Sequence, residues 1–178
     1  MVLFIFLTLS LLFSLLIIFI MGSSLLGLAR THVPFVPTAV SDIIQVGQRL
    51  PIEQNDVFVD LGSGDGRVIF EIEKLTGAKV RGYELTLWTH LLTRLKKSLR
   101  GSHAELIWGD FFKANLTDAT VVYCYLYPPL MRAVGEKILA ECKKGTHVVS
   151  RDFPIPNLEK LDYWKSSGKH EIFVYKIQ

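Results

Sequence analysis

A glycine-rich segment that follows a short apolar stretch carries the pattern most suggestive of chemistry. Residues 57–59, Val-Phe-Val, read as a buried strand and lead directly into Asp60-Leu61-Gly62-Ser63-Gly64-Asp65-Gly66. Glycines at alternating positions let the backbone turn tightly and approach a ligand without obstruction by a Cβ atom. A helix that begins after Gly66 would add unpaired N–H groups at its first turn. The segment therefore predicts a cofactor-binding loop between a strand and a helix.

The spacing of the glycines narrows the class of cofactor. A dinucleotide-binding fingerprint reads G-x-G-x-x-G, and counted from Gly62 it needs a third glycine where Arg67 stands. The spacing instead resembles the D/E-x-G-x-G-x-G loop of enzymes that use S-adenosylmethionine. A glycine-rich turn without a ligand is the alternative. On the first interpretation the cofactor-binding residues of the loop are Asp60, Gly62, Ser63, Gly64 and Gly66.

Two further acidic residues stand where successive strands are expected to end. Glu84 follows the next predicted strand, at the place where a ribose needs an acceptor for its hydroxyl groups. Asp110 follows the third strand and is placed to accept a hydrogen bond from an adenine amino group, with Phe111 offering an apolar or stacking surface. Alone, Glu84 is also consistent with an ordinary strand-end carboxylate and Asp110 with a helix cap. Together with the loop, they predict one site across three strand ends.

Over several motifs the chain resembles the seven-strand protein-lysine methyltransferases. That family includes the mitochondrial enzymes acting on ATP synthase subunit c and the adenine nucleotide translocase, with archaeal and bacterial relatives. The resemblance covers residues 33–157 and rests on segments 34–38, 59–68, 82–85 with Trp88, 108–112 and 145–156. It implies that the methionine and ribose parts of S-adenosylmethionine contact Asp60, Gly62, Gly64 and Glu84, and that Asp110 contacts the adenine.

The acceptor side is expected after the fourth strand, in the segment that ends at Pro128 and Pro129. This segment departs most from the mitochondrial members, so the acceptor is the property least transferable by resemblance. A lysine amine must lose its proton before it can take a methyl group, and an apolar channel helps by lowering the lysine pKa. Tyr125 and Tyr127 are predicted channel walls, and Asp152 is a predicted proton acceptor or lysine anchor. Core packing of the tyrosines and a strand-end cap at Asp152 are the alternatives.

Helix and strand signals alternate from residue 38 onward. The elements that they predict must position the candidate site residues. Thr38 or Ser41 is available to cap a helix near Val40. The pattern predicts an α/β, Rossmann-like, doubly wound sheet of seven strands, mostly parallel, with a C-terminal antiparallel hairpin around Ser166-Ser167-Gly168. The helix that usually precedes this hairpin is expected to be short or missing. Strands are expected at 57–59, 79–85, 104–107, 120–127, 147–150, 158–164 and 171–177.

An N-terminal apolar segment precedes this domain. Residues 2–21 are almost continuously apolar, and about 20 such residues cross a bilayer as a helix. Nothing basic precedes the run, unlike a signal peptide, although cleavage near residues 22–24 is an alternative. Arg30 is the first charged residue, and the basic residues after it favour a cytoplasmic domain. The predicted regions are a single-pass transmembrane anchor at 1–29, a linker at 30–37 and a methyltransferase domain at 38–178.

The remaining composition limits the partners. A net charge of +3 is too small to predict nucleic-acid binding, and the basic residues between 94 and 100 read as the solvated face of an amphipathic helix. Five histidines lack ligand spacing, so no metal site is predicted. Cys124 and Cys142 form no disulfide framework, which suits a reducing compartment.

These patterns together predict a membrane-anchored methyltransferase that uses S-adenosylmethionine and N-methylates lysine side chains of protein substrates, membrane proteins among them. Methylation of nucleic acid or a small molecule is one alternative. Residues 127–130, Tyr-Pro-Pro-Leu, keep the prolines of the N/D/S-P-P-Y/F motif of nucleic-acid enzymes but lack its polar first and aromatic last residues. A catalytically silent cofactor-binding scaffold at the membrane is the other alternative.

Overall fold

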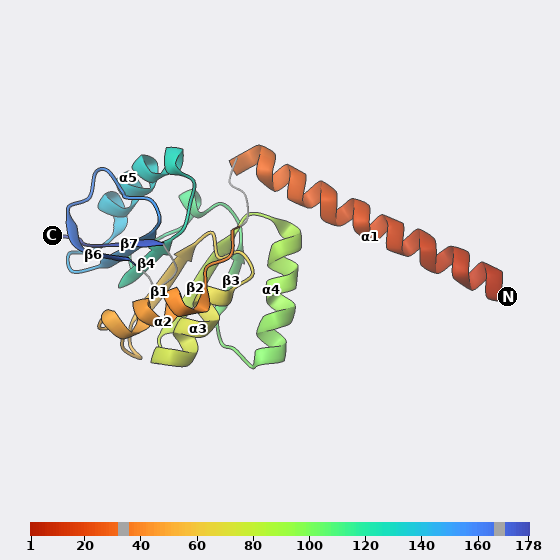
Figure 1. Cartoon of the computed structure of the whole chain (residues 1–178), viewed down its shortest axis with the longest axis horizontal. Coiled ribbons are helices and arrows are strands. Elements are labelled where there is room, and N and C mark those ends of the chain that lie inside the picture. The colour runs from red at the N-terminus through yellow and green to blue at the C-terminus, as the bar shows by residue number, and fades with distance from the viewer. Residues whose placement is uncertain (32–35, 166–169) are drawn as a thin grey trace.

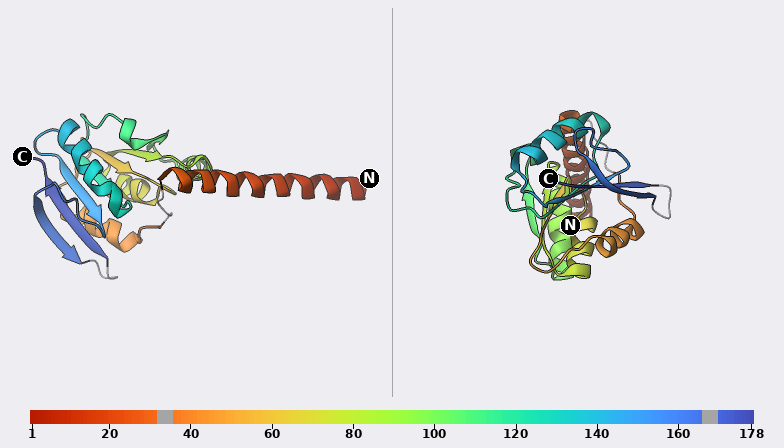
Figure 2. Two further views of the ribbon diagram at one scale, coloured as in Figure 1. Left: turned by 90° about the horizontal axis from the view of Figure 1, so that it is seen from above. Right: turned by 90° about the vertical axis from the view of Figure 1, so that its left-hand side faces the viewer.

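A computed structural model describes residues 1–31, 36–165 and 170–178 as one long helix and one α/β domain (Figure 1). Helix α1 (Val2–Thr31) projects away from the domain in every side view (Figures 1 and 2). Its segment Val2–Ser23 is long and apolar enough to cross a membrane, and none of it is buried. A signal sequence satisfies the same criterion of length and composition. Half of the predicted linker, residues 32–35, lies outside the described residues.

The sheet of the domain has the strand order β3-β2-β1-β4-β5-β7-β6. Strands β1 to β5 pair in parallel, and β7 pairs antiparallel with both β5 and β6. The predicted doubly wound α/β fold with a C-terminal antiparallel hairpin is confirmed; the predicted turn at 166–168 lies outside the described residues. The strands are β1 (Val57–Leu61), β2 (Lys79–Glu84), β3 (Glu105–Trp108), β4 (Val121–Cys124), β5 (His147–Arg151), β6 (Lys160–Lys165) and β7 (Glu171–Lys176).

Helices cover both faces of the sheet. Phe58 points into a core with α2 (Val40–Arg49) and α3 (Arg67–Thr76), whereas its neighbour Val59 points into a second core with α5 (Met131–Glu141). Successive strand residues point to opposite faces, so each central strand supplies both cores. Helix α4 (Leu87–Arg100) follows β2, and the short 3-10 helices η1 (Phe111–Lys113) and η2 (Pro128–Leu130) follow β3 and β4. Burial on both faces is the usual condition of a parallel sheet.

Strand β4 ends three residues earlier than its composition predicts. Its last residue, Cys124, pairs with Leu61, the last residue of β1. Beyond Leu61 the chain turns into the glycine loop, so Tyr125 has no neighbouring strand residue of β1 to pair with. Residues 125–127 therefore form a connection at the carboxyl edge of the sheet, although they are as rich in aromatic residues as a strand.

The predicted side-chain cap of α2 is wrong. Ala39 is the N-cap residue and makes no side-chain cap bond, and Ser41 lies inside the helix. The Thr38 hydroxyl is buried instead, 3.3 Å from the hydroxyl of Tyr123. A buried hydroxyl partner in the core satisfies Thr38 better than the exposed helix end would. The expectation of a missing helix before the hairpin is confirmed, because residues 152–159 contain none.

Candidate active site

The glycine loop connects the carboxyl end of β1 to the first turn of α3. Gly62, Gly64 and Gly66 have φ values of +95°, +53° and +79°. Residues with a Cβ atom rarely adopt these positive φ values. A Cβ on Gly66 would lie 2.6 Å from the side chains of both Phe70 and Thr93, closer than such contacts occur. Backbone conformation and space therefore both require glycine at Gly66.

Strand β2 and helix α4 hold the loop in place. The N–H of Ser63 donates to the carbonyl of Tyr83 at 2.8 Å. The N–H of Gly64 donates to the Glu84 carboxylate at 3.0 Å, and the Thr93 hydroxyl donates to the Gly64 carbonyl at 2.8 Å. The loop after β1 and the acidic residue after β2, which the sequence predicts as parts of one site, are therefore in direct contact.

Asp60 and Glu84 place two carboxyl groups at the ends of adjacent strands. Asp60 is 2% exposed, and burial, together with the charges of Glu84 and Asp65, raises the pKa of Asp60 to about 8. Burial also raises the pKa of Glu84, although hydrogen bonds from Thr86 and Gly64 act in the opposite direction. A nearby positive charge stabilises the ionised form of a buried carboxyl group. The pair therefore suits a ligand that brings positive charge.

Asp65, within the loop, is committed to ion pairs. Its carboxylate accepts from Arg67 and from Lys96 of α4, each at 2.9 Å. Burial opposes ionisation of Asp65, but these two hydrogen bonds outweigh it and lower the pKa of Asp65 to about 2. Lys96 therefore ties α4 to the loop. The amphipathic pattern predicts a solvated position for Lys96, because its partner lies 31 residues away in the chain and leaves no local signal.

Asp110 and Phe111 lie at the end of β3, beyond β2. The N–H of Gly109 donates to the Glu84 carbonyl at 3.0 Å, which places this segment beside the Glu84 strand end. One carboxylate oxygen of Asp110 accepts from the N–H of Phe112 at 2.9 Å and caps η1. Phe111 packs partly against the core on the α5 side. The cap is thus real, and the adenine contact stays a prediction.

The predicted acceptor residues lie at the ends of β4 and β5. The ring of Tyr125 stacks on Phe153 with centroids 6.4 Å apart, and Tyr127 is 45% exposed. Burial and the nearby Asp152 carboxylate raise the pKa of Tyr125. Asp152 has a φ of +63° and accepts from the N–H of Glu171 at 3.1 Å. Asp152 therefore ties β5 to β7, and its catalytic role stays a prediction.

Two residues that sequence reasoning did not single out complete this side. Arg151 is 1% exposed, and its guanidinium carbon lies 4.5 Å from the centroid of the Tyr125 ring. Its Nε and Nη2 donate to Asp42 of α2 at 3.0 Å and 2.9 Å. His170 Nδ1 lies 3.0 Å from both carboxylate oxygens of Asp152. Arg151 is 109 residues from Asp42 in the chain, and His170 is 18 residues from Asp152. No local spacing in the sequence therefore reveals either contact.

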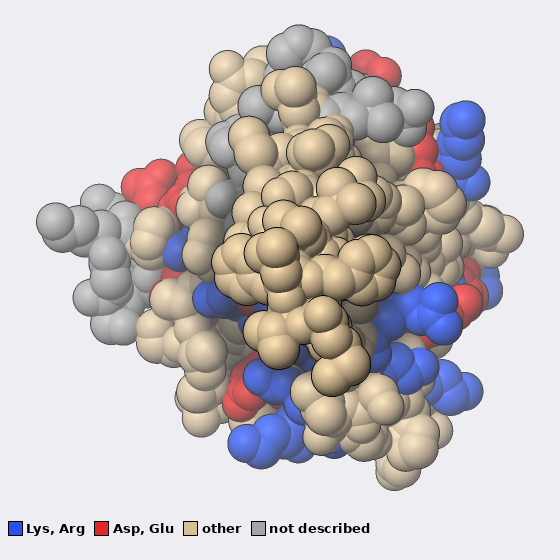
Figure 3. All heavy atoms as spheres, turned by 90° about the vertical axis from the view of Figure 1, so that its right-hand side faces the viewer, with Lys and Arg blue, Asp and Glu red and all other residues tan. Residues whose placement is uncertain are grey.

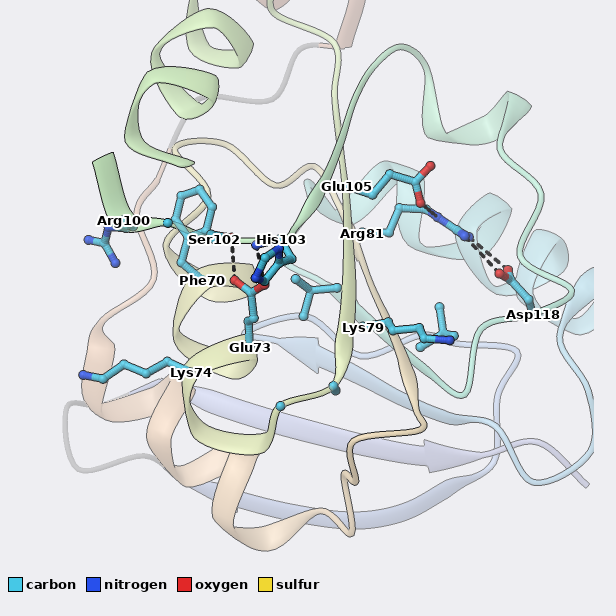
Figure 4. Close-up of a pocket in the computed structure, with 15 residues that line it drawn as sticks. Phe70, Glu73, Lys74, Lys79, Arg81, Arg100, Ser102, His103, Glu105 and Asp118 are labelled. Atoms are coloured by element: carbon cyan, nitrogen blue, oxygen red, sulfur yellow. Dashed lines mark hydrogen bonds and ion pairs between the residues drawn. The ribbon is translucent and has the colours of Figure 1, made fainter. Parts of the chain in front are cut away.

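A cavity of about 970 Å³ lies at the opposite edge of the sheet, at the amino ends of β1 and β2 (Figure 4). No predicted site residue lines it. Three of its charged groups pair with one another: Arg81 with Asp118 at 2.9 Å and with Glu105 at 2.6 Å. Glu73 accepts from the N–H of His103 at 2.7 Å. The carboxyl edge, which collects the predicted residues of five strand ends, is the better candidate for the active site.

The chain is similar to known methyltransferases. Residues 60–162 match the family described as ANTKMT methyltransferase domain. A protein-lysine N-methyltransferase of Saccharolobus islandicus is 28% identical over 82% of this chain and 94% of its own. The adenine nucleotide translocase lysine N-methyltransferase of Mus musculus is 33% identical over 83% of this chain, which spans 65% of the mouse protein.

A solved structure of similar fold was determined with the cofactor product bound. It is an RNA methyltransferase from Salinibacter ruber in complex with S-adenosyl-L-homocysteine, 28% identical, with a TM-score of 0.73. The match covers 80% of this chain and 94% of that one.

Proposed function

Because the chain belongs to the ANTKMT methyltransferase domain family and is an S-adenosylmethionine-dependent methyltransferase, we propose that it N-methylates lysine side chains of protein substrates. The observation that carries the proposal is the relationship to the lysine N-methyltransferase of Saccharolobus islandicus, of which this chain spans 94%. The mouse relative, also named for lysine methylation, supports the same acceptor group. The carboxyl edge contains the groups that this reaction needs.

The carboxyl edge fits the cofactor. We assign the methionine and ribose parts to the glycine loop with Asp60 and Glu84, and the adenine to Asp110 and Phe111. The fit rests on the left-handed glycine loop at the carboxyl end of β1 and on the buried carboxyl pair, which favours a cationic ligand. S-adenosylmethionine supplies an electrophilic methyl group, so the chain needs no covalent nucleophile. The loop and the strand ends contribute alignment, which lowers the barrier.

The acceptor residues would prepare the lysine. A lysine side chain that enters past the exposed Tyr127 reaches the ring of Tyr125, whose other neighbours are Phe153 and Arg151. Contact with these rings, and the positive charge of the buried guanidinium, disfavours the ammonium form and lowers the lysine pKa. We assign acceptance of the released proton to Asp152, which is in contact with His170. Tyr125 and Tyr127 then orient the neutral amine.

The test uses the full chain in detergent with cofactor labelled in its methyl group. Soluble and membrane fractions of a lysate are offered as acceptors, with Glu84→Gln as the cofactor-site control. At a cofactor concentration below saturation, labelled lysine that is identified by mass spectrometry and strongly reduced with the variant is the expected result. Label on small molecules alone, or on no acceptor while the protein binds cofactor, would contradict the proposal.

RNA methylation is a second candidate because the solved Salinibacter ruber structure is described as an RNA methyltransferase. The segment Tyr127-Pro128-Pro129-Leu130, which lacks the polar and aromatic ends of the nucleic-acid motif, argues against this acceptor. Total RNA in the same assay separates the two candidates. Label that survives protease and is lost on ribonuclease treatment would favour RNA.

We further propose that α1 anchors the enzyme with its domain on the cytoplasmic side. The apolar span Val2–Ser23 is followed by Arg30, the first charged residue, and the net charge of the domain side is positive. The test is protease protection of the full chain in sealed membranes with a tag at its C-terminus. Digestion of the domain from the cytoplasmic face is expected, whereas release of a cleaved, soluble domain would show that residues 1–29 are a signal sequence.

A further inference from the structure

Helix α4 turns its leucines outward. Leu91, Leu95 and Leu99 repeat every four residues, a spacing that normally marks the buried stripe of a helix. In the structure they are 41%, 58% and 79% exposed. The inward side is formed by His90 and Thr93, which are buried. The periodicity therefore predicts the helix correctly, but its leucine stripe does not face the core.

The glycine loop explains this orientation. Thr93 donates to the carbonyl of Gly64, and Lys96 pairs with Asp65, so the polar side of α4 is fixed against the loop. A second reason is steric, because the Thr93 methyl group occupies the space beside Gly66. Rotation of α4 that buried its leucines would break these contacts. The outward leucine ridge is a consequence of holding the cofactor loop from α4.

The charges of α4 are all of one sign. Its sequence, Leu87 to Arg100, contains no aspartate or glutamate. Besides Lys96 it carries Arg94, which is exposed next to the leucine ridge, and Lys97 and Arg100, which follow the buried Thr93 by four and seven residues. The guanidinium carbon of the exposed Arg100 lies 5.4 Å from the centroid of the Phe70 ring. Helices α3 and α5, in contrast, each mix acidic and basic residues. An apolar ridge on a helix whose charged residues are all basic is typical of helices that lie in the interface of anionic membranes.

The position of α4 relative to α1 agrees with such a role. The two helices are in contact. Helix α4 lies on the side of the domain from which α1 projects and runs across the direction of α1 (Figures 1 and 2). Viewed from that side, Lys and Arg side chains gather below the base of the apolar helix α1, where α4 lies (Figure 3). If α1 crosses a bilayer, α4 is held along its surface.

We propose that α4 is an interfacial helix that docks the domain on anionic lipid. Leu91, Leu95 and Leu99 enter the headgroup region and Arg94 contacts the lipid phosphates, while Lys97 and Arg100 add positive charge at the flanks of α4. The proposal rests on the membrane placement of α1 and is independent of the identity of the methyl acceptor. Docking would hold the carboxyl edge of β2, from which α4 starts, close to the bilayer. Acceptor lysines near the membrane surface would then be preferred.

The test measures the depth of a probe on α4 in the full chain reconstituted in nanodiscs. Ser98 is exposed beside the leucine ridge, and both native cysteines are buried, so Ser98→Cys accepts a fluorescent label. Ala140→Cys on α5, also exposed, is the matched control. In nanodiscs with phosphatidylglycerol, a nitroxide on the lipid headgroup is expected to quench the Ser98 probe at least about twofold more than the Ala140 probe.

Charge variants and a marker on α1 complete the design. Arg94→Gln and Lys97→Gln are each expected to lower the ratio of docked to undocked domain roughly fivefold, whereas Arg132→Gln on α5 leaves it unchanged. A label at Ser14→Cys reports insertion of α1 separately. Equal quenching at positions 98 and 140, with α1 inserted, would overturn the proposal and leave lysine methylation untouched. Concentration-dependent shielding of position 98 in detergent would overturn it in favour of a second copy of the chain.

Discussion

The N–H of Gly64 donates a hydrogen bond of 3.0 Å to the carboxylate of Glu84, so two segments 20 residues apart form one rigid element of the site. The other carboxylate oxygen accepts from the N–H of Thr86 at 2.6 Å, at the entry to α4. Glu84 thus orders the glycine loop. It also lies at a strand end where a ribose is expected to bind. Loss of its charge should affect the loop and the ligand together.

Glu84→Gln should therefore weaken cofactor binding with little loss of fold. A hydrogen bond to a charged group contributes about 1.5–3 kcal/mol, so we expect the dissociation constant of S-adenosylmethionine to rise roughly 10- to 100-fold. Calorimetric titration in detergent measures it. Glu105→Gln, which removes a carboxylate at the far edge of the sheet, serves as the matched control and should bind normally. Equal affinities of the Glu84 variant and the wild type would remove Glu84 from the cofactor site.

Gly66 offers a separate test of the loop conformation. Gly66→Ala places a methyl group 2.6 Å from Phe70 and Thr93 at a φ of +79°. Gly101→Ala has a similar φ of +62° but meets open space. The left-handed conformation alone costs about 1–2 kcal/mol, and overpacking adds about 1–3 kcal/mol. Urea unfolding should show a clearly larger loss at Gly66, and a loss no greater than at Gly101 would mean that the loop relaxes freely.

The buried Asp60 predicts a pH dependence with a defined sign. Its pKa is about 8 in the folded protein against an ordinary value of 3.8, so the native state holds a proton that the unfolded state releases. Stability attributable to Asp60 is therefore greatest below pH 4, falls as the pH rises toward 8, and is constant above it. The fall is about 1.4 kcal/mol per pH unit between these limits.

Asp60→Asn should abolish this fall. Unfolding free energies of both proteins at pH 5, 6, 7 and 8 would diverge, with the variant gaining relative stability as the pH rises. Parallel curves would show that Asp60 is ionised in the folded protein. The variant also separates stability from function, since it should bind the cationic cofactor more weakly while it unfolds at a higher urea concentration at pH 8.

Sequence reasoning was most successful where one local pattern determines the structure. The strand leading to the glycine loop and the acids after β2 and β3 are contiguous motifs, and the structure brings them to one edge. It failed where the partner is distant in the chain. The leucine period of α4 predicts a helix but not its facing side, because that side is decided by Thr93 and Lys96 against the loop.

The acceptor side shows the same limit. Composition extends β4 to Tyr127, but pairing stops at Cys124 because β1 has already turned away. Arg151 and His170 have no motif, and only the topology places one beside Asp42 and the other beside Asp152. Local patterns therefore predict the cofactor half of the site, and tertiary contacts are needed for the acceptor half.

The buried pair of Arg151 and Asp42 gives the last prediction. Both side chains are 1% exposed, and Asp42→Asn would leave the guanidinium without its main counter-charge beneath Tyr125. Removal of one partner of a buried pair costs about 3–5 kcal/mol, whereas loss of an exposed pair costs less than about 1 kcal/mol. Asp118→Asn, which breaks the exposed pair with Arg81, is the matched control. Urea unfolding compares the two variants.

Because α2 is held to β5 through this pair, Asp42→Asn should also raise the KM for the methyl acceptor more than it raises the KM for the cofactor. Equal destabilisation by the two variants would show that Arg151 finds another partner. The candidate is Asp152, whose carboxylate lies 3.6 Å from Nη1 of Arg151.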